Sequence, residues 1–320
     1  MTLRIVFCSH ETAAETWTAA LRDALARAQV DADVWWRDAK RTAADDSAPQ
    51  ADAAVVWRPP AALFAEQRRL RAVFNLGAGV DALLAIESLP QGLDIYRLED
   101  AGMAQTLSEY VLAAVLRVYR RLDRYAVHQA QRAWRPEPLP ARERFTIGVL
   151  GLGVIGSAIA TTLARHGFAV RGHAQSRKAL AGVECRAGTV EFASFLDGLD
   201  VLVSVLPATD ATCGLLDRAA LGRLAAGAHL INVGRGSTLV EADLVALLDA
   251  RHLSGATLDV FAAEPLPPEH AFWSRRDIVV TPHVAAETEL EPAIAQVADK
   301  LARWMRGAPV TGLVDRARGY

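Results

Sequence analysis

The chain has 320 residues, 22% of them charged and 52% hydrophobic, and a formal net charge of −2. This length favours two domains, and the balance is typical of a globular protein. The small net charge argues against a nucleic-acid partner, and no uninterrupted apolar run is long enough to span a membrane.

Three scattered cysteines, Cys8, Cys185 and Cys213, lack the spacing of a disulfide framework or a metal site. The apolar run at the N-terminus is too short for a signal peptide. We therefore expect a cytoplasmic protein without a metal ion.

The first hundred residues alternate between strand and helix patterns. Residues 3–8 form an apolar, β-prone run, and residues 11–29 follow with helical spacing. Residues 52–57 and 72–76 are predicted as the second and third strands. Such alternation predicts an open, parallel α/β sheet. We expect this part of the chain to form a flavodoxin-like domain.

A long helix is predicted from residue 106 to about 131, because apolar residues recur there on one face. Prolines at alternate positions in residues 135–140 then break the helix and form a stiff linker.

The second half of the chain begins with an apolar strand, Phe145–Leu150, that leads into glycines. Further strands are predicted at residues 168–173, 200–206, 228–233, 255–260 and 277–281. Alternating with helices, they predict a doubly wound Rossmann domain. We expect residues 101–284 to bind a dinucleotide, and residues 1–100, completed by 285–320 with a helix at about 288–306, to bind the substrate.

The glycine motif Gly151-x-Gly153-x-x-Gly156 lies between the strand and a helix that runs to about Arg165. In this context the first glycine allows a tight turn, the second a close approach to pyrophosphate, and the third close packing of helix and strand. The motif therefore predicts a dinucleotide site, which Val154 and Ile155 complete at the helix N-terminus.

Three later segments follow predicted strands, where ligands of open α/β sheets gather. They contain Arg235 between glycines, Glu264 before Pro-Leu, and His283 after Thr-Pro. Each alone could be a surface or structural residue. Together they supply an acid–base pair and an anion-binding arginine, which predicts a catalytic site.

The ordered motifs resemble the D-isomer-specific 2-hydroxyacid dehydrogenases over essentially the whole chain. They are the glycine motif, Asn232-Val-Gly-Arg-Gly236, Asp259-Val-Phe-x-x-Glu-Pro-Leu266 and Thr281-Pro-His-Val284. Segments at 75–81, 97–103 and 314–320 resemble a subgroup that reduces glyoxylate and hydroxypyruvate. The resemblance implies NADPH-dependent reduction of small 2-oxoacids, with NADH as the weaker cofactor.

That reaction needs a proton for the carbonyl oxygen and a partner for the substrate carboxylate. His283 is the candidate acid, because an imidazole titrates near neutral pH, and Glu264 would orient its ring. Arg235 would hold the carboxylate and polarise the carbonyl. The resemblance also implies that Asp259 meets the nicotinamide carboxamide, although a lone Asp can equally be a turn residue.

Further substrate contacts are expected from the first domain. Backbone N–H groups of Leu76, Gly77, Ala78 and Gly79 would hold the other end of the carboxylate, unless this is an ordinary strand-to-helix turn. Trp57 and Arg58 are placed near the substrate on resemblance alone.

Cofactor choice is predicted from charge. NAD-specific domains carry an acid at the end of the second strand, and residues 170–178 contain none. Ser176, Arg177 and Lys178 would bind the 2′-phosphate of NADPH, the alternative being a solvated basic turn. Leu206, Pro207, Val233 and Gly234 are expected to line the cofactor.

Two other functions stay open. The same fold could serve as a cofactor-sensing binding protein, or as a dehydrogenase for another D-2-hydroxy acid. The resemblance and the apolar helix at 106–131 also imply a homodimer, whereas that helix could instead be a hinge within one chain.

Overall fold

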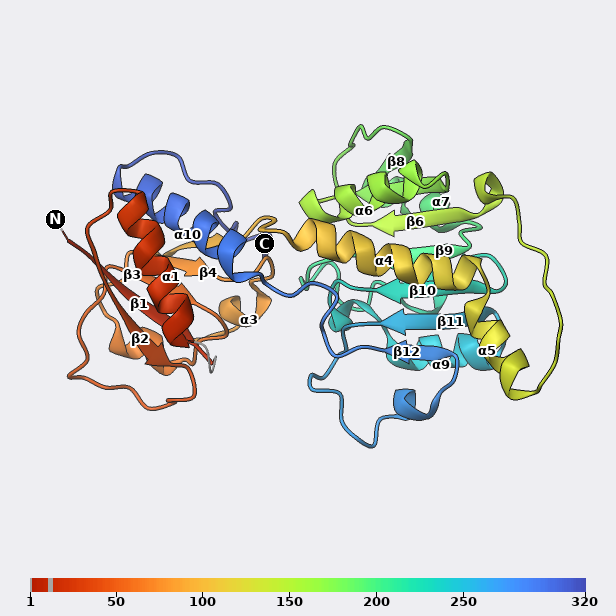
Figure 1. Ribbon diagram of the computed structural model, residues 1–320, viewed down its shortest axis with the longest axis horizontal. Coiled ribbons are helices and arrows are strands. Elements are labelled where there is room, and N and C mark those ends of the chain that lie inside the picture. The colour runs from red at the N-terminus through yellow and green to blue at the C-terminus, as the bar shows by residue number, and fades with distance from the viewer. Residues whose placement is uncertain (1, 11–13) are drawn as a thin grey trace. The chain divides into compact units, whose positions relative to one another are not determined.

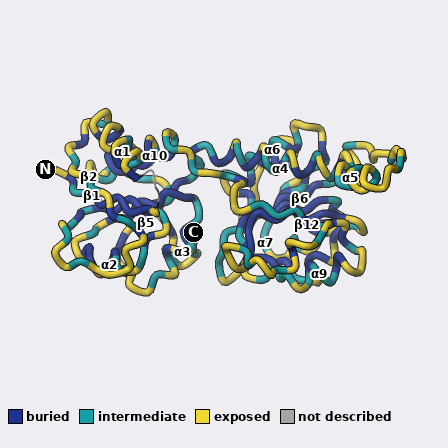
Figure 2. The backbone as a smooth tube through the Cα atoms, turned by 60° about the horizontal axis from the view of Figure 1, so that its bottom comes forward, coloured by how far each residue is buried: buried dark blue, intermediate teal, exposed yellow. Residues whose placement is uncertain are grey.

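The computed structural model describes residues 2–10 and 14–320 and divides into two compact units (Figure 1). Unit 1 comprises the described residues of Met1–Gly102 together with Thr288–Tyr320, and unit 2 comprises Met103–Glu287. Each unit is built on one parallel sheet whose buried strands lie between helices (Figure 2). Among the described residues, no helix is both long enough and apolar enough to cross a membrane.

Unit 1 contains a five-stranded sheet of order β2-β1-β3-β4-β5, with every pair parallel. This is the flavodoxin-like order, which confirms the predicted fold class. Helix α1 packs against α10 on one face, and the short helices α2 and α3 lie on the other (Figure 2). The bounds are β1 Leu3–Ser9, α1 Ala14–Arg27, β2 Ala32–Asp38, β3 Ala53–Val56, α2 Ala62–Glu66, β4 Ala72–Asn75, α3 Asp81–Leu84, β5 Asp94–Arg97 and α10 Leu290–Met305.

Unit 2 contains a seven-stranded parallel sheet of order β12-β11-β10-β9-β6-β7-β8. The order places the first strand of the unit, β6, beside β9, so the strand order reverses between them as in a Rossmann domain. The predicted doubly wound fold is therefore confirmed. The strands are β6 Thr146–Leu150, β7 Ala169–Ala174, β8 Val183–Ala187, β9 Val201–Ser204, β10 Ala228–Asn232, β11 Leu253–Leu258 and β12 Ile278–Val280.

Helices cover both faces of this second sheet. Helices α4 and α6 pack against each other on one face, and α7 and α9 lie on the other (Figure 2). The helices are α4 Met103–Tyr119, α5 Leu122–Ala130, α6 Val154–Arg165, α7 Gly188–Leu196, α8 Arg218–Leu221 and α9 Glu241–Asp249, with short 3-10 turns at Arg142–Arg144, Gly236–Thr238 and Ala271–Ser274.

Parts of the sequence prediction were wrong. Strands β2, β5 and β8 were not expected, so residues 52–57 and 72–76 contain the third and fourth strands of the chain and not the second and third. The single helix at 106–131 is two helices, α4 and α5, because Arg121 adopts a left-handed backbone conformation with φ 55° and breaks the helical path. Residues 11–13 of the helix expected at 11–29 lie outside the described residues.

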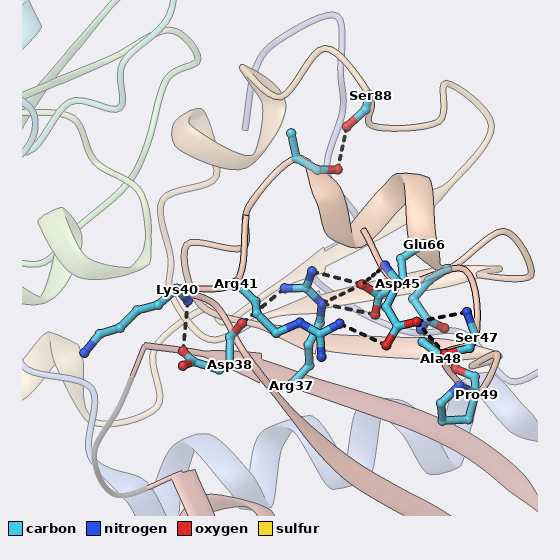
Figure 3. Close-up of polar contacts among 12 residues, drawn as sticks. Arg37, Asp38, Lys40, Arg41, Asp45, Ser47, Ala48, Pro49, Glu66 and Ser88 are labelled. Carbon is cyan, nitrogen blue, oxygen red and sulfur yellow. Dashed lines mark hydrogen bonds and ion pairs between the residues drawn. The ribbon is translucent and has the colours of Figure 1, made fainter. Parts of the chain in front are cut away.

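A buried ion pair fixes the edge strand β2 to helix α2 (Figure 3). The guanidinium of Arg37 donates to both carboxylate oxygens of Glu66 at 3.0–3.2 Å, and each side chain is only 3% exposed. The backbone N–H of Asp45 adds a further donor to Glu66. Burial raises the pKa of the neighbouring Cys8 thiol to about 11, so this cysteine is a neutral core residue.

The C-terminal segment is tied into unit 1 by a buried lysine. Lys300 on α10 donates to the carbonyl oxygens of Arg97, at 2.6 Å, and Thr311, at 3.0 Å, and pairs with Glu99. Since Arg97 ends β5, this lysine joins strand, helix and tail. The first hundred residues and the last thirty therefore form one folded unit.

Candidate functional site

The glycine motif of unit 2 forms a tight turn between β6 and α6. Gly151 has φ 101°, a conformation that favours glycine, and Gly153 is the N-cap of α6. The first intrahelical bond runs from the N–H of Ser157 to the carbonyl of Gly153. The preceding N–H groups at the helix N-terminus are therefore available for an anion.

Two glycines of this motif differ in the space around them. A Cβ on Gly156 would collide with the backbone oxygen of Gly151, so only glycine fits between helix and turn. A Cβ on Gly153 would meet no other atom of the protein within 4 Å. The turn is therefore packed on its inner side and open on its outer side, as a close approach by a phosphate group requires.

Neighbouring loops at the same end of the sheet pack closely around this turn. A Cβ on Gly151 would lie 3.1 Å from the oxygen of Val205, and one on Gly234 would lie 2.6 Å from the backbone of Leu206. Loops after β6, β9 and β10 thus meet, which brings the predicted cofactor residues Leu206 and Pro207 next to Val233 and Gly234. Val154, the first residue of α6, is 55% exposed.

The basic turn after β7 is exposed at Ser176, Arg177 and Lys178. Arg177 donates to the carboxylate of Glu191 on α7 at 2.6 Å and to the carbonyl of Cys185 at 3.0 Å. The backbone N–H of Ala187 and then Arg177 lower the pKa of Glu191. Glu191 was not predicted beside the turn, because it lies on the next helix, α7.

Arg235, Glu264 and His283 follow β10, β11 and β12, which are consecutive neighbours in the sheet. His283 Nδ1 lies 2.8 Å from Glu264 Oε2, while Glu264 Oε1 accepts from the backbone N–H of Phe261 at 3.0 Å. The two side chains are 37% and 26% exposed, so the imidazole is oriented on one side and accessible on the other.

The Arg235 loop is pressed against the Glu264 loop. Gly236 has no room for a Cβ because the backbone of Phe261 occupies that space. Half-buried Arg235 donates from Nη1 to the carbonyl of Gly234 at 2.8 Å. The predicted catalytic residues therefore belong to loops that pack together at one edge of the sheet.

Asp259, directly after β11, is only 1% exposed. Its Oδ1 accepts from the Thr281 hydroxyl at 2.6 Å and from the N–H of Val284 at 2.9 Å, and its Oδ2 accepts from the N–H of Ala285 at 2.9 Å. Its carbonyl accepts from the N–H of His283 at 2.9 Å. Asp259 thus holds the His283 loop, a role that the sequence analysis did not assign to it.

The predicted substrate residues Leu76–Gly79 of unit 1 form a short loop after β4. The prediction was wrong for Leu76, because its N–H donates to the carbonyl of Val56 at 2.9 Å and is not available to a carboxylate. The carboxamide of Asn75 donates to the carbonyls of Gly77 and Gly79 at 3.0 and 2.9 Å. Since the N–H that follows a trans carbonyl points the opposite way, the N–H groups of residues 78 and 80 point away from Asn75. Asn75 is thus a shaping residue that the sequence analysis missed, although it opens the quoted segment 75–81.

Trp57 and Arg58 lie beside this loop within unit 1. The ring of Trp57 fills the space that a Cβ of Gly77 would need. The guanidinium of Arg58 lies 5.7 Å from the centre of the Trp57 ring, and Arg58 has φ 46°. Trp134, beside the proline-rich segment 135–140, is 99% exposed and packs into no core.

Within the described ranges, no three His, Cys, Asp or Glu residues gather as metal ligands. A doubly wound domain with an open glycine turn, and an oriented histidine beside an arginine loop, defines the class of nicotinamide-dependent dehydrogenases.

Comparison with known proteins gives the family. The family model "D-isomer specific 2-hydroxyacid dehydrogenase, NAD binding domain" matches residues 112–285. Glyoxylate/hydroxypyruvate reductase A of Serratia proteamaculans is 43% identical over 99% of this chain and 100% of its own length, and that of Yersinia enterocolitica is 41% identical over the same shares.

Two solved structures are similar over their full length and that of this chain. A D-isomer specific 2-hydroxyacid dehydrogenase from Xanthobacter autotrophicus, in complex with NADPH and MES, has a TM-score of 0.91 and 38% identity. An NADPH-dependent glyoxylate/hydroxypyruvate reductase from Sinorhizobium meliloti, in complex with NADP and sulfate, has a TM-score of 0.87 and 33% identity. The chain belongs to the D-isomer specific 2-hydroxyacid dehydrogenase family, and it is an NAD(P)-dependent enzyme.

The two glycines give a matched test of the dinucleotide turn. Gly153→Ala should fold as the wild type does but bind NADPH roughly tenfold more weakly or worse, because its methyl group enters the open outer side. Gly156→Ala should lose roughly 1–3 kcal/mol of stability through overpacking. Thermal melts and fluorescence titration with NADPH measure both effects. Unchanged NADPH affinity in folded Gly153→Ala would contradict the assignment.

Proposed function

We propose that the chain is an NADPH-dependent reductase of small 2-oxoacids, converting glyoxylate to glycolate and hydroxypyruvate to D-glycerate. The observation that carries the proposal is the 2.8 Å contact of His283 with Glu264, beside the Arg235 loop. The full-length similarity to glyoxylate/hydroxypyruvate reductase A supports the substrate class. A cytoplasmic location agrees with the three free cysteines.

The residues around the glycine turn fit a dinucleotide. Gly153 leaves open space, and the α6 N-terminus offers N–H groups to its phosphates. Loops carrying Leu206 and Pro207, and Val233 and Gly234, form the adjoining wall. NADPH bound there supplies the hydride.

His283 acts as the proton donor to the carbonyl oxygen of the substrate. Glu264 accepts at Nδ1, which leaves Nε2 to carry the transferred proton and stabilises the positive charge of the ring. Arg235 binds the substrate carboxylate and polarises the carbonyl, because its planar fork matches a carboxylate in two parallel hydrogen bonds. In unit 1, the N–H groups of Gly77, Ala78 and Gly79, with Trp57 and Arg58, are proposed to bind the substrate carboxylate, whereas the N–H of Leu76 donates to the carbonyl of Val56.

The basic turn accounts for the preference for NADPH over NADH. Ser176, Arg177 and Lys178 are exposed, and cationic side chains with a hydroxyl suit a 2′-phosphate. Arg177 is held by Glu191, so its guanidinium is oriented before a phosphate arrives, and the phosphate has to compete with that carboxylate. This competition makes the preference a matter of degree.

The chain is proposed to act as a homodimer through the segment 121–141. Helix α5 has no buried residue, and four large apolar residues along the segment are exposed to solvent. They are Leu122 at 55%, Val127 at 46%, Trp134 at 99% and Leu139 at 38%. A second copy of the same surface would cover them.

His283→Gln should reduce turnover of glyoxylate by about 10²- to 10⁴-fold, the usual contribution of a positioned acid, while NADPH affinity stays unchanged. Steady-state kinetics and NADPH titration measure the two effects. His166→Gln is the control, because His166 is an exposed histidine at the far end of α6. Near wild-type turnover in His283→Gln would remove it as the acid.

Replacing both Arg177 and Lys178 by Ala should raise the KM for NADPH by about tenfold or more, since charge-assisted hydrogen bonds contribute about 1.5–3 kcal/mol each. The KM for NADH should change little, so NADH is the internal control. Equal changes for both cofactors would show that the basic turn does not bind the 2′-phosphate.

Light scattering of the purified protein should give twice the mass of one chain. Leu122→Glu combined with Val127→Glu should give the mass of a single chain, because charges would face the partner surface. Val190→Glu on α7 is the matched control, since Val190 is an apolar residue 93% exposed outside the segment. A wild-type protein with the mass of one chain would contradict the dimer.

A further inference from the structure

A hydroxyl on helix α4 reaches the His283 loop. Tyr110 lies 2.6 Å, oxygen to oxygen, from Thr281, a residue 171 positions later in the chain. Thr281 in turn lies 2.6 Å from Oδ1 of the buried Asp259. Three side chains from α4, the loop after β12 and the loop after β11 therefore form one continuous chain of hydrogen bonds.

The donor and acceptor of each hydrogen bond follow from the number of hydroxyl protons. An ionised carboxylate only accepts, so the single hydroxyl proton of Thr281 goes to Asp259. The Thr281 oxygen must then accept from Tyr110, which donates. Burial raises the pKa of Tyr110, which keeps its proton in place. Hydrogen bonds in such a chain polarise and strengthen one another.

The loop that this chain holds is strained at His283. The residue has φ 57°, a left-handed conformation that costs roughly 1–2 kcal/mol for a side chain with a Cβ. Asp259 counteracts the strain by accepting from the N–H groups of His283, Val284 and Ala285. The position of the imidazole therefore depends on where the Asp259 carboxylate lies. Thr281 donates the third hydrogen bond to that carboxylate and so helps to fix its position.

We propose that Tyr110 is a positioning residue for His283, acting through Thr281 and Asp259. This inference rests on the proposed role of His283 as proton donor. Tyr110 is connected to His283 through Thr281 and Asp259, so its effect on the reaction is indirect. A loosened loop would displace the acid while leaving the dinucleotide turn at β6 intact.

The test compares Tyr110→Phe with Tyr119→Phe. Both tyrosines lie on α4, and the Tyr119 hydroxyl donates to the carbonyl of Pro140 at 3.0 Å, away from the loop. Tyr110→Phe should lower kcat for glyoxylate about tenfold, with the Kd for NADPH and the melting temperature matching those of Tyr119→Phe. A kcat within twofold of that of Tyr119→Phe would overturn the inference.

Variants of Thr281 test whether Tyr110 acts through the Thr281 hydroxyl. Thr281→Val removes the intermediate hydroxyl and should lower kcat at least as far as Tyr110→Phe does, while Thr281→Ser should restore most of the loss. Because both residues act in one chain, the double variant Tyr110→Phe with Thr281→Val should be no slower than Thr281→Val alone. Fully additive losses would contradict action through Thr281.

A readout independent of turnover separates this inference from the proposed function. NMR of the histidine-labelled protein, with the His283 signal assigned through His283→Gln, should show a shifted imidazole resonance in Tyr110→Phe and none in Tyr119→Phe. If the wild type reduces neither glyoxylate nor hydroxypyruvate, the proposed function fails while this structural coupling is still measured. An unshifted resonance in Tyr110→Phe would overturn the coupling itself.

Discussion

The buried carboxylate of Asp259 joins the ends of two neighbouring strands and holds the loop that carries His283. It satisfies two backbone N–H groups and one hydroxyl, while its own carbonyl accepts from His283. The left-handed backbone of His283 persists because these bonds over-determine it. The imidazole can then meet Glu264 at 2.8 Å and keep its other nitrogen accessible. The proposed chemistry depends on this arrangement more than on any single catalytic side chain.

Both sheets could be predicted from the sequence because their central strands are short, continuous apolar runs such as residues 146–150 and 201–204. The missed strands β2, β5 and β8 all lie at sheet edges, where one side of the strand faces no neighbour. Their sequences mix charged and apolar residues, so local pattern alone does not separate them from loops. Strand β2 is held by the Arg37–Glu66 pair, a contact 29 residues apart that no local pattern encodes.

The candidate site was predictable where its residues directly follow strands. Arg235, Glu264 and His283 could be grouped because parallel strands end at one edge of a sheet. Their supporting partners could not be found in this way. Tyr110 lies in the helix expected at residues 106–131 without any predicted contact, and Glu191 belongs to no motif. Their roles arise from contacts with segments that are distant in the sequence. Asp259 was expected to meet the cofactor, and its hydrogen bonds to the loop became evident only in three dimensions.

The most direct measurement follows the loss of nicotinamide absorbance when purified protein is mixed with NADPH or NADH and with glyoxylate or hydroxypyruvate in turn. Rapid oxidation of NADPH by at least one of these 2-oxoacids, with much slower oxidation of NADH, is the predicted result. It would support the reaction class and the basic turn together. Tight binding of NADPH without oxidation by either 2-oxoacid would contradict the proposed function.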